Sequence, residues 1–422
     1  MSKSYVQVFK DVLSNKNILT IALTTSLISI TDMSYRPYWQ LYLKHNLGAD
    51  MVAIGLLSSI SSSERLLFQL PGGILADRYG RRKIIIYGTA LRIIPPIIYL
   101  FASHWTHTIP ALLFAGAASI YMPAFNAIIA DSLPREERGA GYGAYRTITS
   151  IPWVIAPIIG GWVMDNYGYE TGIKAFMVFG IFINIFVTYA RYRMLNETLT
   201  FEDKGPSGRK RPGIKDSLLS IFKMDKSVKA MVIVSFLGSF GIQMVMSFLS
   251  VYARDILLFS NTQIGLISTT GGFIAMILAM PGGMLADKFG RKPMILLSRI
   301  TAPLSYLGVT FVANFQQYYT IMVANSIGNA LGGGGMYAGG PAWNALLAEL
   351  VPQQNLATVM GAIGTLSGLM AIPSPMIGGW MWDEIDPKMP FYASVAFGLV
   401  SAGIFAVGVK EPDKTEVLDI QA

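Results

Sequence analysis

The chain has 422 residues, of which 52% are hydrophobic and only 14% are charged. A soluble domain carries about 25% charged residues, so this composition favours a membrane protein over a protein with one large soluble core. The net charge of +8 raises nucleic-acid binding as an alternative, and a chain without cysteine cannot form disulfides, thiolate metal sites or a thiol nucleophile.

Apolar segments long enough to cross a bilayer, which takes on the order of 20 residues, recur along the whole chain. We place twelve predicted spans at 17–43, 51–71, 84–103, 109–131, 140–163, 172–193, 228–253, 263–281, 294–313, 317–349, 356–382 and 390–409. The tenth is long and interrupted by glycines. The polar first 16 residues predict no cleavable signal peptide. The sequence therefore predicts an all-α membrane protein with twelve transmembrane helices in contact with the lipid bilayer.

The basic residues gather on one side of the predicted membrane. With the N-terminus in the cytoplasm, most of the 33 Lys and Arg residues fall in cytoplasmic segments, and the outer loops hold only Lys44, Lys174, Arg254 and Lys388. Short loops rich in Lys and Arg stay on the cytoplasmic side. The positive charge therefore reflects topology, so we expect no nucleic-acid partner and place both termini on the cytoplasmic side of the cell membrane.

The first predicted span carries charges among its apolar residues. Asp32, Tyr35, Arg36 and Trp39 follow the spacing i, i+3, i+4 and i+7, which places them on one face of a helix. Pro37 is expected to kink that helix beside them. A charge at the centre of a span costs about 2.5–3.5 kcal/mol on insertion scales, so charges that persist there indicate function or internal pairing.

The second half of the chain repeats the first. The stretch PGGILADRYGRRK (71–83) returns as PGGMLADKFGRKP (281–293), an offset of 210 residues. PAFNAIIADSLP (123–134) returns as PAWNALLAELVP (341–352), and PIIGGWVMD (157–165) returns as PMIGGWMWD (375–383), both at an offset of 218. Two such copies predict parallel six-helix bundles related by an axis along the membrane normal. We expect an N-terminal bundle at 1–193, a cytoplasmic linker at 194–226, and a C-terminal bundle with a short tail at 227–422.

The loop after the second span, with its second copy, resembles the signature loop of the major facilitator superfamily. The matching residues are Gly73, Asp77, Arg78, Gly80 and Arg81, and in the second copy Gly283, Asp287, Gly290 and Arg291. The resemblance covers essentially the whole chain. It implies the fold of that superfamily, transport by alternating access, and a role of these loops in latching the two halves on the cytoplasmic side. The alternative is a purely topological role, with basic residues that stop translocation.

Elementary chemistry favours the gating role for this loop. Glycine permits a tight turn, and an aspartate can accept from backbone N–H groups at a helix N-terminus. The arginines are expected to pair with an acid at another helix end. Asp131 and Glu349 are placed for that pairing at the cytoplasmic ends of the fourth and tenth spans.

The fifth span resembles the glycine and proline motif of antiporter-type members of the same superfamily. Gly143, Pro157, Gly160 and Gly161 carry the resemblance, and the eleventh span holds a similar Pro375-x-x-Gly378-Gly379. Pro152 and Ala156 depart from the pattern. Close helix packing by small residues is the alternative explanation. The stretch ALLFAGAASIYMPAFNAIIA (111–130) of the fourth span contains no charge, so it lacks the arginine that drug–proton antiporters of this family usually carry there, which argues against a standard drug-antiport mechanism.

Six charged residues lie deep in the spans of the first half: Asp32, Arg36, Glu64, Arg65, Arg92 and Arg146. The repeat places uncharged residues at all six equivalent positions, which are Ile242, Met246, Ile274, Ala275, Ala302 and Gly364. The scaffold therefore forms without these charges in one copy. This comparison predicts that function is concentrated in the N-terminal half.

We expect the deep charges to form a site for protons and substrate. Asp32 is the first candidate for the proton carrier and Glu64 the second. Burial and a nearby arginine act in opposite directions on the pKa of a carboxyl group, so movement of a helix or of the substrate could switch its protonation. Arg36 is the expected partner of Asp32 or the anchor of the substrate, and we expect at least one of Glu64 and Arg65 to pair with Asp32 or Arg92. An excess of arginine favours an anionic or carboxylate-bearing substrate. Internal ion pairs that only hold helices together are the alternative.

The second half offers softer candidates for substrate contact. These are Gln243, Asn325, Asn329, Trp343 and Asn344, for which helix packing is the alternative role. Arg299 lies near a span end, where it is expected to snorkel and to be structural. The three histidines have no metal-ligand spacing, and the GGGG stretch at 332–335 lacks the Lys-Ser/Thr of a phosphate loop. We expect no metal and no cofactor, with a proton gradient as the energy source.

The sequence thus predicts a monomeric secondary transporter that moves a small organic, anionic or amphiphilic solute across the cytoplasmic membrane, and not an enzyme. The motif of the fifth span favours export by proton antiport. A proton-symport importer of an organic anion or sugar remains an alternative. A receptor or scaffold on the same fold is the third hypothesis, although a scaffold would not need six deep charges.

Overall fold

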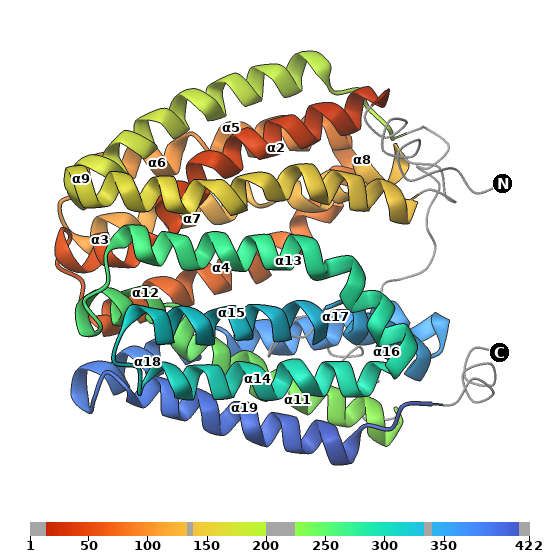
Figure 1. Cartoon of the computed structure of the whole chain (residues 1–422). Coiled ribbons are helices and arrows are strands. Elements are labelled where there is room, and N and C mark those ends of the chain that lie inside the picture. Colours follow the sequence, from red (N-terminus) through yellow and green to blue (C-terminus); the bar gives the residue numbers. More distant parts are fainter. Residues whose placement is uncertain (1–13, 133–137, 200–223, 333–339, 413–422) are drawn as a thin grey trace. The chain divides into compact units, whose positions relative to one another are not determined.

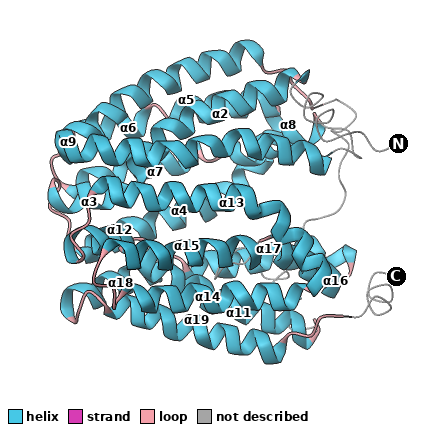
Figure 2. Cartoon of the chain, viewed as in Figure 1, coloured by secondary structure: helices cyan, strands magenta, loops and turns pink. Residues whose placement is uncertain are grey.

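The computed structural model describes residues 14–132, 138–199, 224–332 and 340–412. These residues are almost entirely helical, and no strand occurs among them (Figure 2). Seven helices or runs of consecutive helices in the described part are long and apolar enough to cross a membrane, and the bent pair Asn261–Leu278 and Pro281–Phe289 would be an eighth. The predicted all-α membrane fold is confirmed.

The first half begins with α2 (Lys16–Tyr35), which the side chain of Asn15 caps by accepting from the backbone N–H groups of Asn17 and Ile18. The turn at Pro37 is the 3-10 helix η1 (Arg36–Tyr38), after which α3 (Trp39–His45) completes the first span. The helices that follow are α4 (Met51–Tyr79), α5 (Arg81–Leu91), α6 (Ile94–Leu100), η2 (Trp105–Thr108), α7 (Ile109–Ala118), α8 (Tyr121–Asp131) and α9 (Arg138–Met194).

The second half shows a similar succession of helices. They are α11 (Lys226–Met246), α12 (Leu249–Val251), the π-helix η5 (Tyr252–Ile256), α13 (Asn261–Phe289), α14 (Arg291–Val309), α15 (Phe315–Gly332), α16 (Pro341–Leu350), α17 (Gln353–Met370), α18 (Pro373–Glu384) and α19 (Met389–Gly408). Each predicted span coincides with one helix, with consecutive helices, or with one part of α9. Residues 333–339 of the tenth span, and most of the predicted linker, lie outside the described residues.

Glycines with positive φ separate helices that would otherwise run together. Gly168 has a φ of 76° and divides α9 between the fifth and sixth predicted spans. Gly80, with a φ of 97°, separates α4 from α5, and Gly290, with a φ of 93°, separates α13 from α14. Residues with a Cβ rarely adopt this conformation. The last glycine of each signature loop therefore provides the turn predicted for it.

The chain forms two compact units. The first comprises Met1–Ala49, Ser63–Gly208 and Ser260–Gly272, and the second comprises Asp50–Ser62, Arg209–Phe259 and Phe273–Ala422. Each unit therefore contains most of one sequence half and a short helical segment from the other. In the first unit α2 packs along α9 and α5 along α8, and in the second α11 packs along α19 and α14 along α15 (Figure 1).

The cores of the two units use equivalent positions of the repeat. Ile85 and Phe125 of the first core correspond to Ile295 and Trp343 of the second. The correspondence extends to Ile18 and Val228, Ile21 and Met231, Ala76 and Ala286, Ala124 and Ala342, Ile128 and Leu346, and Ile129 and Leu347. The internal repeat read from the sequence is thus also a repeat of packing.

Candidate functional site

An ion pair joins two of the deep charges of the first half. Nη2 of Arg92 lies 2.6 Å from Oδ2 of Asp32, with side chains that are 27% and 31% exposed respectively. Asp32 lies on α2, and Arg92 is the residue at which α5 ends. A half-exposed pair of this kind can still be reached by a proton or a ligand. Its two members come from the first and third spans, so sequence spacing alone could not identify it.

Arg36 does not take the predicted place beside Asp32. Its side chain is exposed, and it begins the 3-10 turn η1 where α2 has already ended. The backbone N–H of Arg36 still donates to the carbonyl of Asp32, as in a continuous α-helix, so it is the direction of the Arg36 side chain and not the helical register that departs from the prediction. Arg92 supplies the guanidinium instead. The role of Arg36 as a substrate anchor stays a prediction.

An aromatic cluster adjoins the ion pair through Tyr35, which follows Asp32 by three residues on α2. The rings of Tyr35 and Trp39 are 6.2 Å apart, in an edge-to-face arrangement, and Trp39 lies 4.6 Å from the ring of Tyr99. Tyr99 belongs to α6 and is 9% exposed. The predicted face of the first span is therefore an aromatic surface completed by a residue that sequence reading missed. Tyr99 lies seven positions after Arg92, and this spacing could have drawn attention to it.

Glu64 is buried against α7 in the same unit. It is 5% exposed, and its Oε1 atom has no hydrogen-bond partner among the residues that the structure describes. A Cβ added at Gly116 would lie 2.6 Å from the Cβ of Glu64, so the glycine makes room for this side chain. A buried polar atom without a hydrogen-bond partner costs free energy of folding, so the position of Glu64 on α4 calls for a functional explanation.

The other candidate residues lie in different surroundings. Arg146 is exposed on α9, and the side chain of Arg65 is outside the described part of the structure. In the second half, Asn329 donates from Nδ2 to Oδ1 of the buried Asn325 at 3.0 Å. Trp343 is 2% exposed and lies in the hydrophobic core. Gln243 is partly buried and Asn344 is exposed.

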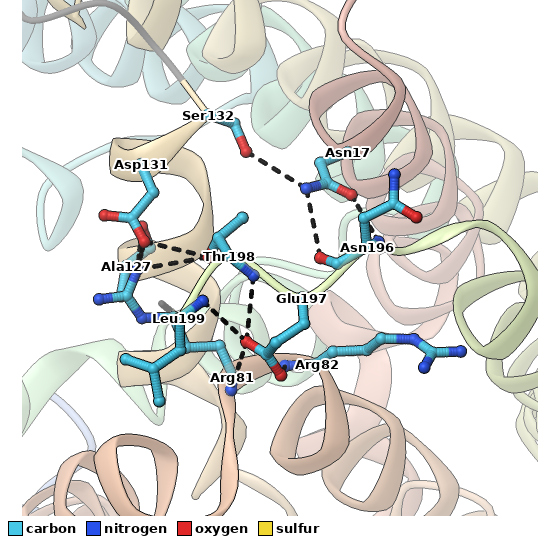
Figure 3. Close-up of polar contacts among 10 residues, drawn as sticks. All are labelled: Asn17, Arg81, Arg82, Ala127, Asp131, Ser132, Asn196, Glu197, Thr198 and Leu199. Atoms are coloured by element: carbon cyan, nitrogen blue, oxygen red, sulfur yellow. Dashed lines mark hydrogen bonds and ion pairs between the residues drawn. The ribbon is translucent and has the colours of Figure 1, made fainter. Parts of the chain in front are cut away.

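The first signature loop is held by a cluster of polar contacts (Figure 3). Arg81 forms an ion pair with Asp131, as predicted, and Thr198 donates to Oδ2 of Asp131 at 3.0 Å. The carboxylate of Glu197 accepts from the backbone N–H groups of Arg81 and Arg82, each at 3.1 Å. It therefore caps α5, where the helix dipole favours an anion. The surroundings of Gly73 and the side chain of Asp77 are outside the described part of the structure, and Arg78 is exposed beside the ring of Tyr79.

The second signature loop has the same construction. Arg291 forms an ion pair with Glu349 and lies 3.8 Å from Asp287. The carboxylate of Glu411 accepts from the backbone N–H of Arg291 at 2.6 Å and from that of Lys292 at 3.1 Å. The anion at the helix N-terminus is thus a glutamate that follows the last helix of each half, where the sequence favoured the aspartate of the loop. Sequence reading missed both glutamates, although each lies three residues after the last residue of its helix.

A second pair of caps lies at the N-termini of α13 and α4. In the first unit, the carboxylate of Asp165 accepts from the backbone N–H of Asn261 at 2.9 Å and from that of Thr262 at 2.8 Å. In the second unit, Oδ2 of Asp383 accepts from the backbone N–H of Val52 at 3.0 Å. Asp165 and Asp383 end the repeated PIIGGWVMD and PMIGGWMWD stretches. They bind the starts of α13 and α4, the segments that each unit takes from the other half.

The glycines of the fifth-span motif allow close helix packing within the first unit. A Cβ at Gly160 would meet the backbone of Ser34, and one at Gly161 would meet the backbone of Asn261. The hydroxyl of Tyr38 donates to the carbonyl of Pro157 at 2.7 Å. These contacts support the interpretation that the glycines serve helix packing. The surroundings of Gly143 are outside the described part of the structure.

Comparisons with known proteins agree with this architecture. The sequence profile of the Major Facilitator Superfamily matches residues 21–260 and 231–422. The multi-drug resistance efflux pump PmrA of Streptococcus pneumoniae is 26% identical over 370 residues, which is 85% of this chain and 87% of that protein. The quinolone resistance protein NorA of Staphylococcus aureus is 29% identical over 198 residues, or 47% of this chain and 49% of NorA. The crystal structure of a D-xylose–proton symporter shares the fold, with a TM-score of 0.71 and 16% identity over 97% of this chain and 99% of that one.

Proposed function

The chain belongs to the Major Facilitator Superfamily and is a secondary transporter of that type, and we propose that it exports a small organic molecule in exchange for protons. It is a multi-pass protein of the cell membrane that acts on small-molecule substrates, and it is not an enzyme. Export is favoured because PmrA is an efflux pump and NorA a resistance protein by name.

The observation that carries the proposal is the ion pair between Asp32 and Arg92 beside an aromatic cluster. The equivalent positions of the second half hold Ile242 and Ala302, so the fold does not require these charges. The pair, at 2.6 Å, is a charge-assisted hydrogen bond that a proton on the carboxylate would weaken. Protonation of Asp32 would then free Arg92 for a substrate anion, and substrate on Arg92 would free Asp32 for a proton.

The same site suggests the chemistry of the substrate. A guanidinium binds carboxylates and other anions through paired hydrogen bonds. Beside it, the half-buried rings of Tyr35 and Trp39 offer an apolar surface. We therefore infer an amphiphilic substrate with an aromatic part and an anionic group. Glu64 is proposed as a second proton site, because it is buried and its Oε1 atom has no hydrogen-bond partner among the described residues.

We also propose that both termini are cytoplasmic and that the protein works as a monomer. The distribution of Lys and Arg supports the orientation, since few lie in the opposite loops. The separate core of each unit supports the monomer. Labelling of a terminal tag in intact and opened cells tests the first statement, and the mass of the detergent-solubilised protein tests the second.

Transport in proteoliposomes with an imposed pH gradient tests the proposed function. A panel of aromatic carboxylates, cationic drugs and sugars would be offered to the wild type, to Asp32→Asn and to Lys174→Gln, a control that removes only an exposed pair with Glu170. We expect proton-driven movement of an aromatic carboxylate that Asp32→Asn abolishes and Lys174→Gln preserves. Movement along with the protons would identify an importer. No flux of any compound, with wild type and Asp32→Asn alike, would overturn the transporter mechanism.

A further inference from the structure

Each unit contains one fully buried arginine that forms no ion pair among the described residues. Arg191 on α9 and Arg299 on α14 are each 1% exposed. Arg191 donates only to hydroxyls: Nε to Thr24 at 3.1 Å, Nη1 to Thr89 at 2.7 Å and Nη2 to Thr25 at 3.2 Å. Arg299 donates from Nη1 to Ser401 at 3.0 Å. Arg299 thus does not snorkel as expected, and Arg191, near the end of the sixth span, was not recognised from sequence.

Both guanidinium groups lie against the same ring of the repeat. The Cζ atom of Arg191 is 5.5 Å from the ring centre of Phe125, and that of Arg299 is 4.7 Å from the ring centre of Trp343. Phe125 and Trp343 occupy equivalent positions. Cations close to an aromatic face are attracted by the ring, and more strongly where water is excluded. The two units therefore hold a guanidinium at the same place in their cores.

The helix that carries this guanidinium differs between the units. Arg299 on the ninth span is equivalent to Thr89 on the third. Arg191 and Phe405 are also equivalent, because each lies three residues before the last residue of its helix, Met194 and Gly408. In one unit Arg191 reaches across to Thr89, and in the other Arg299 reaches across to Phe405, with 5.7 Å between Cζ and the ring centre. The buried arginine thus lies on the sixth helix of the first half and on the third helix of the second half, and the residue that it contacts lies on the other helix of each pair.

A third residue explains why the exchange matters. Arg92 lies three positions after Thr89 on the same helical stretch, and the position equivalent to Arg92 in the second half is Ala302. Like charges three or four residues apart on a helix destabilise it. An arginine at position 89 would also compete with Arg92 for Asp32. The second unit has no such conflict, so Arg299 can lie on the third helix of its repeat.

We infer that Arg191 and Arg299 are one structural element of the repeat, a buried guanidinium that links the third and sixth helices of each half beneath the ring of Phe125 or Trp343. In the first half, its position on α9 keeps α5 free for Arg92. Arg191 is thus a positioning residue for the Asp32–Arg92 pair. This last statement rests on the proposed function, whereas the structural element does not.

Exchange of the two positions within each unit tests the inference. The first exchange is Thr89→Arg with Arg191→Phe, the second is Arg299→Thr with Phe405→Arg, and Arg191→Phe and Arg299→Thr alone are the references. We expect each single change to lower the melting temperature by about 5 °C, or to abolish recovery of monodisperse protein, because buried hydroxyls or rings lose their partner. Each double exchange should recover most of that loss. Double variants that are no more stable than the single variants would overturn the inference that the two arginines form one structural element.

A second arm tests the separation from Arg92. Adding both Arg92→Ala and Asp32→Ile to the first exchange reproduces the Ala302 and Ile242 environment of the second half, so it should raise the melting temperature further, and an unchanged or lower value would contradict the like-charge argument. The second exchange should leave transport and its pH profile as in the wild type. The first should shift the pH profile and raise KM several-fold. Identical profiles for both exchanges would remove the positioning role, and a wild type without transport would refute the proposed function but leave the thermal results standing.

Discussion

Removal of the Glu197 carboxylate is expected to loosen the start of α5. This carboxylate accepts from the backbone N–H groups of Arg81 and Arg82, at 3.1 Å each, and it lies at the positive end of the helix dipole. Loss of a cap costs about 1 kcal/mol, and loss of a charge at a helix N-terminus about 0.3–1 kcal/mol. Glu197→Ala should therefore destabilise this turn by about 1–2 kcal/mol. Glu197→Gln, which keeps an acceptor but not the charge, should cost about half as much.

Hydrogen exchange of a peptide covering 81–91 measures this effect. A loss of about 1–2 kcal/mol corresponds to exchange that is roughly 5–30 times faster at the affected amides. Glu411→Ala should do the same to the start of α14, because Glu411 accepts from Arg291 and Lys292 in the same way. Glu170→Ala, which removes an exposed pair with Lys174, serves as the control.

Two results would refute this reasoning. Unchanged exchange at 81–91 in Glu197→Ala would show that the carboxylate does not cap the helix in the membrane. Equal effects of Ala and Gln at this position would show that the retained acceptor contributes nothing and that the negative charge accounts for the whole effect, which would contradict the expected halving.

Three further expectations follow from single contacts. Gly116→Ala should lower both transport and melting temperature, at a cost of about 1–3 kcal/mol, because the added Cβ would lie 2.6 Å from the Cβ of Glu64. Gly361→Ala, with no atom within 4 Å of its added Cβ, should be nearly neutral in the same thermal assay, and equal losses would contradict the steric argument. Asp165→Ala should speed hydrogen exchange at the start of α13, and unchanged protection there would contradict its capping role. Asp225, which caps α11, has a pKa below the ordinary aspartate value because it accepts from a backbone N–H of the first turn. Its contribution is therefore present above the unfolded-state pKa and is lost as the pH falls through the folded-state pKa, so thermal stability should decline on acidification more in the wild type than in Asp225→Ala.

Much of the architecture was predictable because it depends on local features of the chain. The apolar spans, the glycine turns at Gly80 and Gly290 and the two copies of the loop are all readable from hydropathy and from repetition. The ion pairs of Arg81 with Asp131 and of Arg291 with Glu349 were also predicted, since both partners lie at helix ends whose place follows from the spans.

The partners inside the bundles were decided only by tertiary structure. The spacing on the first span favoured Arg36 beside Asp32, whereas the folded chain brings Arg92 there from another helix. The contact between Arg191 and Thr89 likewise depends on how two helices are rotated against each other. Periodicity shows which residues share a face of one helix, but the face that a neighbouring helix turns toward it is set by packing of the whole bundle. The sequence by itself determined the spans, the repeat and the loops, and packing alone decided which charges meet.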